Sequence, residues 1–370
     1  MRILCVCPKY YPRIGGVATH VRNIAERLAG KHDVTVFVTN TIRDLPVEEE
    51  LNGVRIRRFG CIAPHDSYNL SFTLCGAVRK VCADIVHIHG YDDLTPFLTI
   101  LLKNRRQKCL FTLHSGGSSS EFRKALRIPY NMIMSKIMQN VDRIICVSEF
   151  ELQHFQRVLR LPREKFAFVP NGVDCEEIRG NPCRKTSSYS LLSVGRLEKY
   201  KGHHRVLRGF KSFKVLHPDI KIDLCIVGNG PYKSSLQRES ELLGLHDYVH
   251  FVSWLPQREY RSLLKESLAL VLLSDYESQS IVVSESLCAR TPVIVSDNSA
   301  LADYVRQNLA LGVANPDDPR EVASKIESLL SGTYGQRTHN YNPASWEDVV
   351  ARLIRIYQEV LTSDGNKHPR

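Results

Sequence analysis

Two glutamates, Glu277 and Glu285, are the strongest candidates for chemistry in this chain. Their separation is a little over two helical turns, so a helix that begins near Ser280 leaves Glu277 in the preceding loop and carries Glu285. Carboxylates accept hydrogen bonds from sugar hydroxyls, and the free N–H groups of a first helical turn attract phosphate. The spacing fits a site for a phosphorylated sugar, although a capping carboxylate followed by an exposed helical residue explains it equally well.

Two cationic residues follow a predicted strand over Tyr189–Val194. Arg196 and Lys201 offer a fixed guanidinium and an ammonium group, which together can hold a pyrophosphate. Ordinary charges on a solvated loop are the alternative. Their position directly after a strand favours the binding site.

Histidines end two consecutive predicted strands. His87 and His89 close the first, Asp84–Ile88, and His114 closes the second, Cys109–Leu113. A single histidine at a strand end is usually structural, but two such strands favour a site at this edge. A zinc centre would need a third ligand, which the sequence does not identify, so no metal is expected.

Glycines follow the first predicted strand, Ile3–Cys7, and precede a helix over Val17–Leu28. Gly15 and Gly16 allow close backbone approach at a helix N-terminus, where anions bind. The pair does not form G-x-G-x-x-G, which disfavours a nicotinamide cofactor.

Strands and helices alternate along the whole chain, which predicts parallel sheets with helices on both faces. The other predicted strands are Val34–Val38, Val54–Phe59, Arg143–Val147, Phe166–Val169, Ile222–Val227, Tyr248–Val252, Leu268–Leu273 and Pro292–Val295. The pattern restarts after a polar stretch, so we expect two Rossmann-like doubly wound domains. The first comprises residues 1–170 plus 345–370, because Ser345 and Asp348 can begin a last helix, and the second comprises residues 171–344.

Length and composition agree with two globular domains. The chain has 370 residues, of which 43% are hydrophobic and 24% charged. No apolar run approaches the roughly 20 residues of a membrane span, and the N-terminus has the pattern of a strand rather than a signal peptide. The eleven cysteines include no C-x-x-C pair. We therefore expect a cytoplasmic protein with reduced, mostly buried thiols, such as Cys5 and Cys7 on one strand face.

Nearly all of the +11 formal charge belongs to residues 1–170. Residues 103–108 form a basic loop. Residues 121–139 combine Arg123, Lys124, Arg127 and Lys136 with apolar side chains, including Met132, Met134 and Met138, and contain Pro129, which can split a helix. This mixture predicts contact with an anionic membrane or a lipid acceptor; a packed helix with a solvated charged face is the alternative.

Seven segments occur in a fixed order: Gly15-Gly16-Val17, residues 84–90, Thr112-Leu113-His114, residues 169–174, Val194-Gly195-Arg196 with Lys201-Gly202, residues 226–231, and Glu277 to Glu285. In this order they resemble the family 4 retaining glycosyltransferases. The resemblance spans residues 1–360 and implies the GT-B fold, in which two such domains face each other across a cleft and a C-terminal helix returns to the first domain.

The resemblance also implies roles for individual residues. Arg196 and Lys201 would hold the donor pyrophosphate, Glu277 the transferred sugar, Glu285 the ribose, and His114 the sugar near the reaction centre. Gly16 would approach phosphate and acceptor, the amides of Ile281 and Val282 the phosphate, and Gly228 the base. The chain departs from the family pattern at Gln279 and Ser280, where an aromatic residue and a glycine are usual, and at Arg290, where a glycine is usual.

We therefore expect a retaining hexosyltransferase that uses a UDP- or GDP-sugar, with a lipid-linked glycan or anionic glycolipid as acceptor, peripheral at the inner membrane face. The chain has no Asp-x-Asp motif, so no metal cofactor is expected. One alternative is a GT-B sugar-nucleotide epimerase; another is a basic protein that binds membrane or nucleic acid without turnover. No nucleic-acid recognition motif is present, so nucleic acid is not an expected partner.

Overall fold

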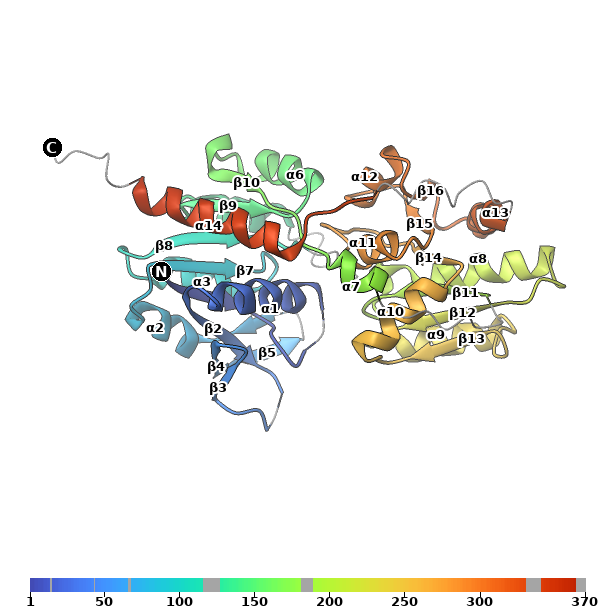
Figure 1. Ribbon diagram of the computed structural model, residues 1–370, viewed down its shortest axis with the longest axis horizontal. Helices are drawn as coiled ribbons and strands as arrows, with labels where there is room; N and C mark the ends of the chain where they lie inside the picture. The colour runs from blue at the N-terminus through green and yellow to red at the C-terminus, as the bar shows by residue number, and fades with distance from the viewer. Residues whose placement is uncertain are drawn as a thin grey trace. The chain divides into compact units, whose positions relative to one another are not determined.

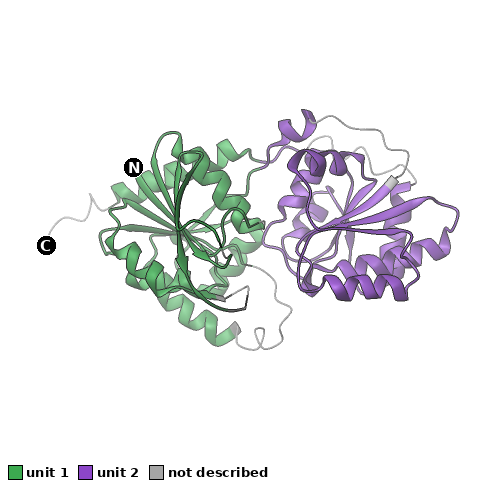
Figure 2. Ribbon diagram, turned by 90° about the horizontal axis from the view of Figure 1, so that it is seen from below, with its two compact units in different colours: residues 1–116, 120–172, 344–370 green, residues 117–119, 173–343 purple. Residues whose placement is uncertain are grey.

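The computed structural model describes residues 1–13, 15–42, 44–65, 68–115, 127–180, 189–330 and 341–363. These residues form two compact units, coloured separately in Figure 2. Unit 1 contains the described residues of 1–172 and 344–363, and unit 2 those of 173–343. The chain thus passes from unit 1 to unit 2 after Gly172 and returns after Pro343.

Unit 1 is built on an eight-stranded sheet in the order β10-β9-β8-β7-β1-β2-β4-β3, in which only the β3–β4 pair is antiparallel. Its strands are β1 (Arg2–Cys7), β2 (Asp33–Asn40), β3 (Glu48–Leu51), β4 (Val54–Gly60), β7 (Ile85–His89), β8 (Lys108–Thr112), β9 (Arg143–Cys146) and β10 (Phe166–Phe168). A separate ribbon pairs β5 (Ile62–His65) with β6 (Tyr68–Leu70). The helices are α1 (Gly16–Ala29), α2 (Phe72–Lys80), α3 (Leu94–Leu102), α5 (Arg127–Met138), α6 (Glu149–Leu159), α14 (Trp346–Thr362) and the 3-10 turn η1 (Arg163–Lys165).

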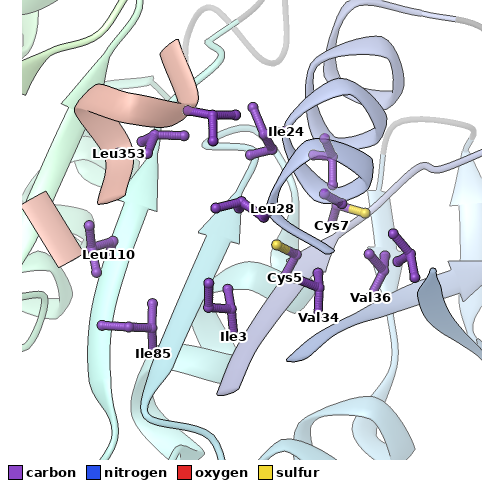
Figure 3. Close-up of a cluster of buried hydrophobic side chains, with 14 of the residues drawn as sticks. Ile3, Cys5, Cys7, Ile24, Leu28, Val34, Val36, Ile85, Leu110 and Leu353 are labelled. Atoms are coloured by element: carbon purple, nitrogen blue, oxygen red, sulfur yellow. The ribbon is translucent and has the colours of Figure 1, made fainter. Parts of the chain in front are cut away.

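Strand β1 divides its side chains between two cores. Ile3, Cys5 and Cys7 pack with Leu28 of α1 and Leu353 of α14 in one cluster (Figure 3). Leu4 and Val6 lie in a second cluster with residues of α2, α5 and α6. A strand alternates its faces, so a sheet covered by helices on both sides has apolar residues at every strand position.

The last helix belongs to unit 1, as expected. Ser345 caps α14, and its hydroxyl accepts a hydrogen bond from the Asp348 amide while the Asp348 carboxylate accepts one from the Ser345 amide. This reciprocal capping box satisfies two amides that have no intrahelical acceptor. Figure 1 shows α14 beside α1, where Leu353 and Tyr357 are buried.

Unit 2 contains a six-stranded, wholly parallel sheet in the order β13-β12-β11-β14-β15-β16. The strands are β11 (Tyr189–Val194), β12 (Ile222–Val227), β13 (Val249–Val252), β14 (Ala269–Leu272), β15 (Val293–Ser296) and β16 (Leu311–Val313). The helices are α7 (Cys175–Gly180), α8 (His203–Leu216), α9 (Lys233–Leu242), α10 (Gln257–Glu266), α11 (Ile281–Cys288), α12 (Leu301–Arg306), α13 (Pro319–Leu330) and the 3-10 turn η2 (Lys199–Lys201). Renumbered within the unit, this order is 3-2-1-4-5-6, that of a doubly wound dinucleotide-binding sheet.

The cysteines differ from expectation at one pair. Cys5, Cys7, Cys109, Cys146 and Cys225 are buried free thiols, as predicted. The expectation of reduced thiols is wrong for Cys175 and Cys288, which form a disulfide between α7 and α11 with Cα atoms 5.1 Å apart. The two residues lie 113 positions apart, so only the packing of the two helices could bring them together.

No helix in the described part of the chain is long and apolar enough to cross a membrane.

Candidate functional site

The candidate residues of unit 2 follow β11 and β14, which are adjacent strands of the sheet. Because β12 lies on the other side of β11, the strand order reverses at this point. Ligands of doubly wound sheets bind at such a reversal, beyond the carboxyl ends of the strands. Arg196 and Lys201 come after β11, and Glu277 comes after β14.

A glycine sets the position of Lys201. Gly202 has φ of +75°, and a Cβ atom there would lie 1.9 Å from the carbonyl oxygen of Leu273, directly after β14. Only glycine permits this approach. The turn therefore brings Lys201 to the end of β14, at the start of the loop that carries Glu277.

Lys201 and Glu277 form an ion pair at the centre of the site. Lys201 Nζ donates to Glu277 Oε1 at 2.7 Å, and the Ser274 hydroxyl donates to the same oxygen at 2.8 Å. The Glu277 amide donates to Ser299 Oγ at 3.0 Å, which fixes the backbone. Among the described residues no donor bonds Glu277 Oε2. The side chain is 10% exposed, and its carboxylate has one oxygen available to a ligand.

Arg196 adds a second cation near Lys201. Its guanidinium pairs with Glu198, and its charge acts on Lys201. Burial by itself lowers the pKa of Lys201, but the neighbouring Glu277 carboxylate outweighs it, so the pKa of Lys201 lies above its usual value. Lys201 is therefore a full cation at neutral pH. The structure thus pairs Lys201 with Glu277 and places Arg196 near enough for its charge to act on Lys201.

Glu285 has separate partners. It lies in α11, and Tyr260 of α10 donates its hydroxyl to Glu285 Oε2 at 2.7 Å. Removal of the carboxyl from water raises its pKa to about 7, partly opposed by the Tyr260 hydrogen bond. None of the described hydrogen bonds joins Glu285 to Glu277 or Lys201. The predicted helix start is confirmed: Ser280 caps α11 and accepts from the Val283 amide.

The first-turn amides of α11 are available by helix geometry. The Ser280 hydroxyl accepts its hydrogen bond from the Val283 amide, not from the amides of Ile281 and Val282. Amides of a first helical turn have no acceptor within the helix. They remain our predicted phosphate contacts.

Gly228, the predicted neighbour of the base, is required by packing. Its φ is +153°, and a Cβ atom there would lie 1.9 Å from the carbonyl oxygen of Gly195. The loops after β12 and β11 can therefore touch only if residue 228 is glycine. A role toward a base remains a prediction.

Histidines gather in unit 1. His114 lies two residues beyond β8 and has a φ of +47°, a backbone conformation that side-chain-bearing residues seldom adopt and that clusters at functional sites. Its Nε2 lies 3.4 Å from Nδ1 of His89, which is fully buried. His20 of α1, which the sequence did not single out, packs edge-on against the His114 ring at 4.4 Å between centroids. His87 instead bonds Tyr357 and Thr112, both at 2.7 Å, which is a structural role.

A buried glutamate holds the loop that carries His114. Glu151 of α6 accepts hydrogen bonds from the amides of Ser115 at 3.1 Å and Val147 at 2.8 Å. Burial raises its pKa to about 7, and the two amides oppose this shift. The sequence offers one signal for it: Ser148 three residues earlier, which caps α6.

Gly16 begins α1 and faces open space. A Cβ atom at this position would meet no atom within 4 Å, and its φ is not positive. No acidic residue and no capping side chain occupies the first turn. Neither packing nor backbone conformation requires a glycine at this position. The space that a side chain would fill is therefore open to a ligand.

Two family models match the chain in succession. Residues 14–177 match Glycosyltransferase Family 4, and residues 174–345 match Glycosyl transferases group 1. The chain belongs to the family 4 glycosyltransferases and has their GT-B fold of two doubly wound domains. It is a glycosyltransferase enzyme.

Its relatives include two enzymes that are named for different lipid products or acceptors. An uncharacterized glycosyltransferase of Methanocaldococcus jannaschii is 25% identical, over 99% of this chain and 100% of its own length. A GDP-mannose:cellobiosyl-diphosphopolyprenol alpha-mannosyltransferase of Xanthomonas oryzae is 24% identical over 98% of this chain and 97% of its own. An alpha-monoglucosyldiacylglycerol synthase of Streptococcus pneumoniae is 22% identical over 92% and 85%.

Solved structures share the fold. Sucrose-phosphate synthase from Thermosynechococcus elongatus superposes with a TM-score of 0.77 at 20% identity, over 98% of this chain and 100% of that chain. The Anabaena protein Alr3699/HepE, solved with UDP and glucose, has a TM-score of 0.71 at 14% identity, over 99% and 100%.

Proposed function

We propose that this enzyme transfers a hexosyl group from a UDP- or GDP-sugar to a hydroxyl of a lipid-linked glycan or glycolipid, with retention of the anomeric configuration. The observation that carries the proposal is the group of Arg196, Lys201 and Glu277 at the strand reversal of unit 2. It combines two cations with a carboxylate whose second oxygen is available to a sugar hydroxyl.

The arrangement suits departure of a nucleoside diphosphate. Cleavage of the bond between sugar and phosphate leaves negative charge on the diphosphate and positive charge on the sugar. Arg196 and Lys201 stabilise the negative charge on the diphosphate as it develops, because fixed charges need no reorganisation during the reaction. The resemblance implies attack by the acceptor from the same face, without a covalent enzyme intermediate. His114 is our predicted contact to the transferred sugar, held by the backbone that Glu151 anchors.

A transfer assay tests the proposal. The purified chain is incubated with UDP-glucose, UDP-N-acetylglucosamine or GDP-mannose and a membrane lipid extract, and glycolipids are identified by mass spectrometry and the new linkage by NMR. We expect one donor to yield a product with the donor's anomeric configuration, and Glu277→Gln to abolish it. Inverted products, or equal yield from the variant, would contradict the proposal.

A lipid acceptor is supported by the surface of unit 1. On α5 the side chains of Ile128, Met132 and Ile133 are 73%, 67% and 60% exposed, and Lys136 is exposed beside them. The adjacent helix α3 ends in exposed Leu101 and Leu102, followed by the basic loop. Met134 and Met138 are buried, so the predicted methionine surface is reduced to Met132. The rest of the predicted amphipathic segment, residues 121–126, lies outside the described residues.

Vesicle flotation tests this surface. Exposed apolar residues flanked by basic ones bind anionic interfaces. We expect the chain to float with phosphatidylglycerol vesicles, less so at high salt, and the Ile128→Ser/Met132→Ser double variant to remain in solution. The matched control changes Leu216 and Leu242, which are equally exposed in unit 2, to serine. Equal loss of flotation in both double variants would contradict the assignment to α5.

A further inference from the structure

Three histidines of unit 1 come from three separate elements and converge. His20 lies in α1, His89 ends β7, and His114 follows β8. One ring nitrogen from each lies within 4.8 Å of those of the other two. The sequence identified two of these residues at neighbouring strand ends, and the packing of α1 on the sheet supplies the third.

A hydrogen bond fixes His20 in the form that can bind a metal. Its Nδ1 lies 2.7 Å from Oδ1 of Asn171, an oxygen that only accepts, so Nδ1 carries the proton. Nε2 therefore keeps its lone pair. That atom is buried and has no hydrogen-bond partner among the described residues. Ligating histidines commonly donate their second nitrogen to an oxygen in this way.

The other two rings are spaced as metal ligands are. Nδ1 of His89 and Nε2 of His114 lie 3.4 Å apart and share a hydrogen bond, which bonds from both nitrogens to a metal ion would replace. Nitrogens placed 2.0–2.1 Å from a tetrahedral zinc are separated by about 3.3–3.4 Å. His89 Nε2 is also buried without a partner in the described chain, so no second hydrogen bond accounts for the orientation of this ring.

The charge state of the cluster is suitable. The neutral imidazole is the ligating form of histidine, and His20 and His89 are fully buried, where a charged ring is disfavoured. Nitrogen ligands favour zinc and similar transition ions over magnesium or calcium.

We propose that His20, His89 and His114 form a binding site for a divalent transition-metal ion, zinc in the first instance, with one coordination position open. His114 is only partly buried, so a water molecule can complete the tetrahedron. This inference rests on the proposed function, in which His114 contacts the transferred sugar. A His114 ring that is bound to the ion cannot make that contact. Zinc then inhibits transfer without weakening nucleotide binding to unit 2.

Metal binding to the full chain, measured without donor or acceptor, tests the site directly. The metal-free protein is titrated with Zn²⁺ by calorimetry and with Co²⁺ by visible absorption. We expect one ion per chain, and a tetrahedral Co²⁺ spectrum without thiolate charge-transfer bands. His20→Gln and His89→Gln should each weaken binding at least a hundredfold, and Asn171→Leu about tenfold to a hundredfold.

Two controls separate this site from other metal-binding groups. Cys82→Ser removes an exposed thiol and His246→Ala an exposed imidazole, and both should leave the affinity unchanged. Circular dichroism and nucleotide binding report whether each variant is folded. Absence of binding, thiolate bands on Co²⁺, or affinity unaltered in folded His20→Gln would each overturn the proposal. The Co²⁺ spectrum of the unaltered chain decides the matter if a variant does not fold.

Discussion

Lys201 Nζ lies 2.7 Å from Glu277 Oε1, so the cation expected to meet a leaving diphosphate is paired with the carboxylate expected to hold the sugar. The two groups come from loops after adjacent strands. Each holds the other in position before a donor arrives, and Ser274 and Ser299 fix the glutamate further. A site arranged in advance in this way does not have to be ordered during the reaction.

The first prediction separates the two partners of this pair. Lys201→Met should lower kcat about a hundredfold to a thousandfold, because one fixed charge on the leaving group is lost. Glu277→Gln should also lower kcat but leave the affinity for nucleoside diphosphate within about threefold, since the sugar is the only part of the donor that we expect it to contact and the glutamine amide oxygen can still accept a hydrogen bond from Lys201. Steady-state kinetics and calorimetry provide both values, and Lys233→Met is the control for loss of a lysine in the same unit. A Glu277→Gln variant that binds the diphosphate as poorly as Lys201→Met would contradict these roles.

The second prediction concerns pH. The pKa of Glu285 is about 7, and only the ionised carboxylate accepts from both hydroxyls of a ribose. The charged form is lost as the pH falls through 7, so nucleotide affinity should decrease below pH 7 and approach a tenfold loss per unit. Calorimetry at pH 5.5 to 8.5 measures this slope. In Glu285→Gln the nucleotide affinity should be low at every pH. Any pH dependence that remains in this variant comes from protonation of the phosphate of the nucleotide. Equal slopes of affinity against pH in the two proteins would exclude Glu285 from the site.

The third prediction concerns the start of α1. Gly16→Ala should leave the unfolding free energy unchanged or raise it by up to about 1 kcal/mol, because alanine favours a helix and would meet no atom within 4 Å. The same change should raise the KM for donor or acceptor. Urea unfolding and kinetics test the two halves independently. Unaltered kinetics would show that no ligand approaches this glycine.

The fourth prediction concerns stability alone. Arg290 follows α11 with φ of +63°, in the left-handed region, and its side chain is exposed. Arg290→Gly should stabilise the protein by about 1 kcal/mol, whereas Arg290→Ala should not, because alanine carries the same conformational cost. Thermal unfolding of the three proteins checks this order. Equal stabilisation by alanine would indicate that the arginine side chain, rather than the backbone, is unfavourable.

The sequence was sufficient for most of the fold because parallel strands buried on both faces are continuous apolar runs. Every predicted strand is present within a few residues of its expected bounds. Two strands of the large sheets were missed for physical reasons, and the two strands of the β5–β6 ribbon were also not predicted. β3 contains three consecutive glutamates, which suit an exposed edge and carry no hydrophobic signal, and β16 has only three residues, one of them Gly312.

The site was predictable where it depends on strand ends and not where it depends on packing. Arg196, Lys201 and Glu277 could be placed because each follows a strand. Tyr260 and His20 could not, because each lies inside a helix that has an ordinary amphipathic pattern. Glu151 lies in the first turn of α6, where the capping residue Ser148 is its one sequence signal. The Cys175–Cys288 bond has the same origin, in the contact of two helices distant in sequence.

The central claim is that unit 2 binds the nucleoside diphosphate of a sugar donor. Calorimetric titration of the full chain with UDP, GDP and ADP, repeated with Arg196→Ala and Glu285→Ala, tests it most directly. We expect saturable binding of UDP or GDP at one site per chain, weakened by both substitutions. Failure of all three nucleotides to bind, or binding that neither substitution weakens, would contradict the account.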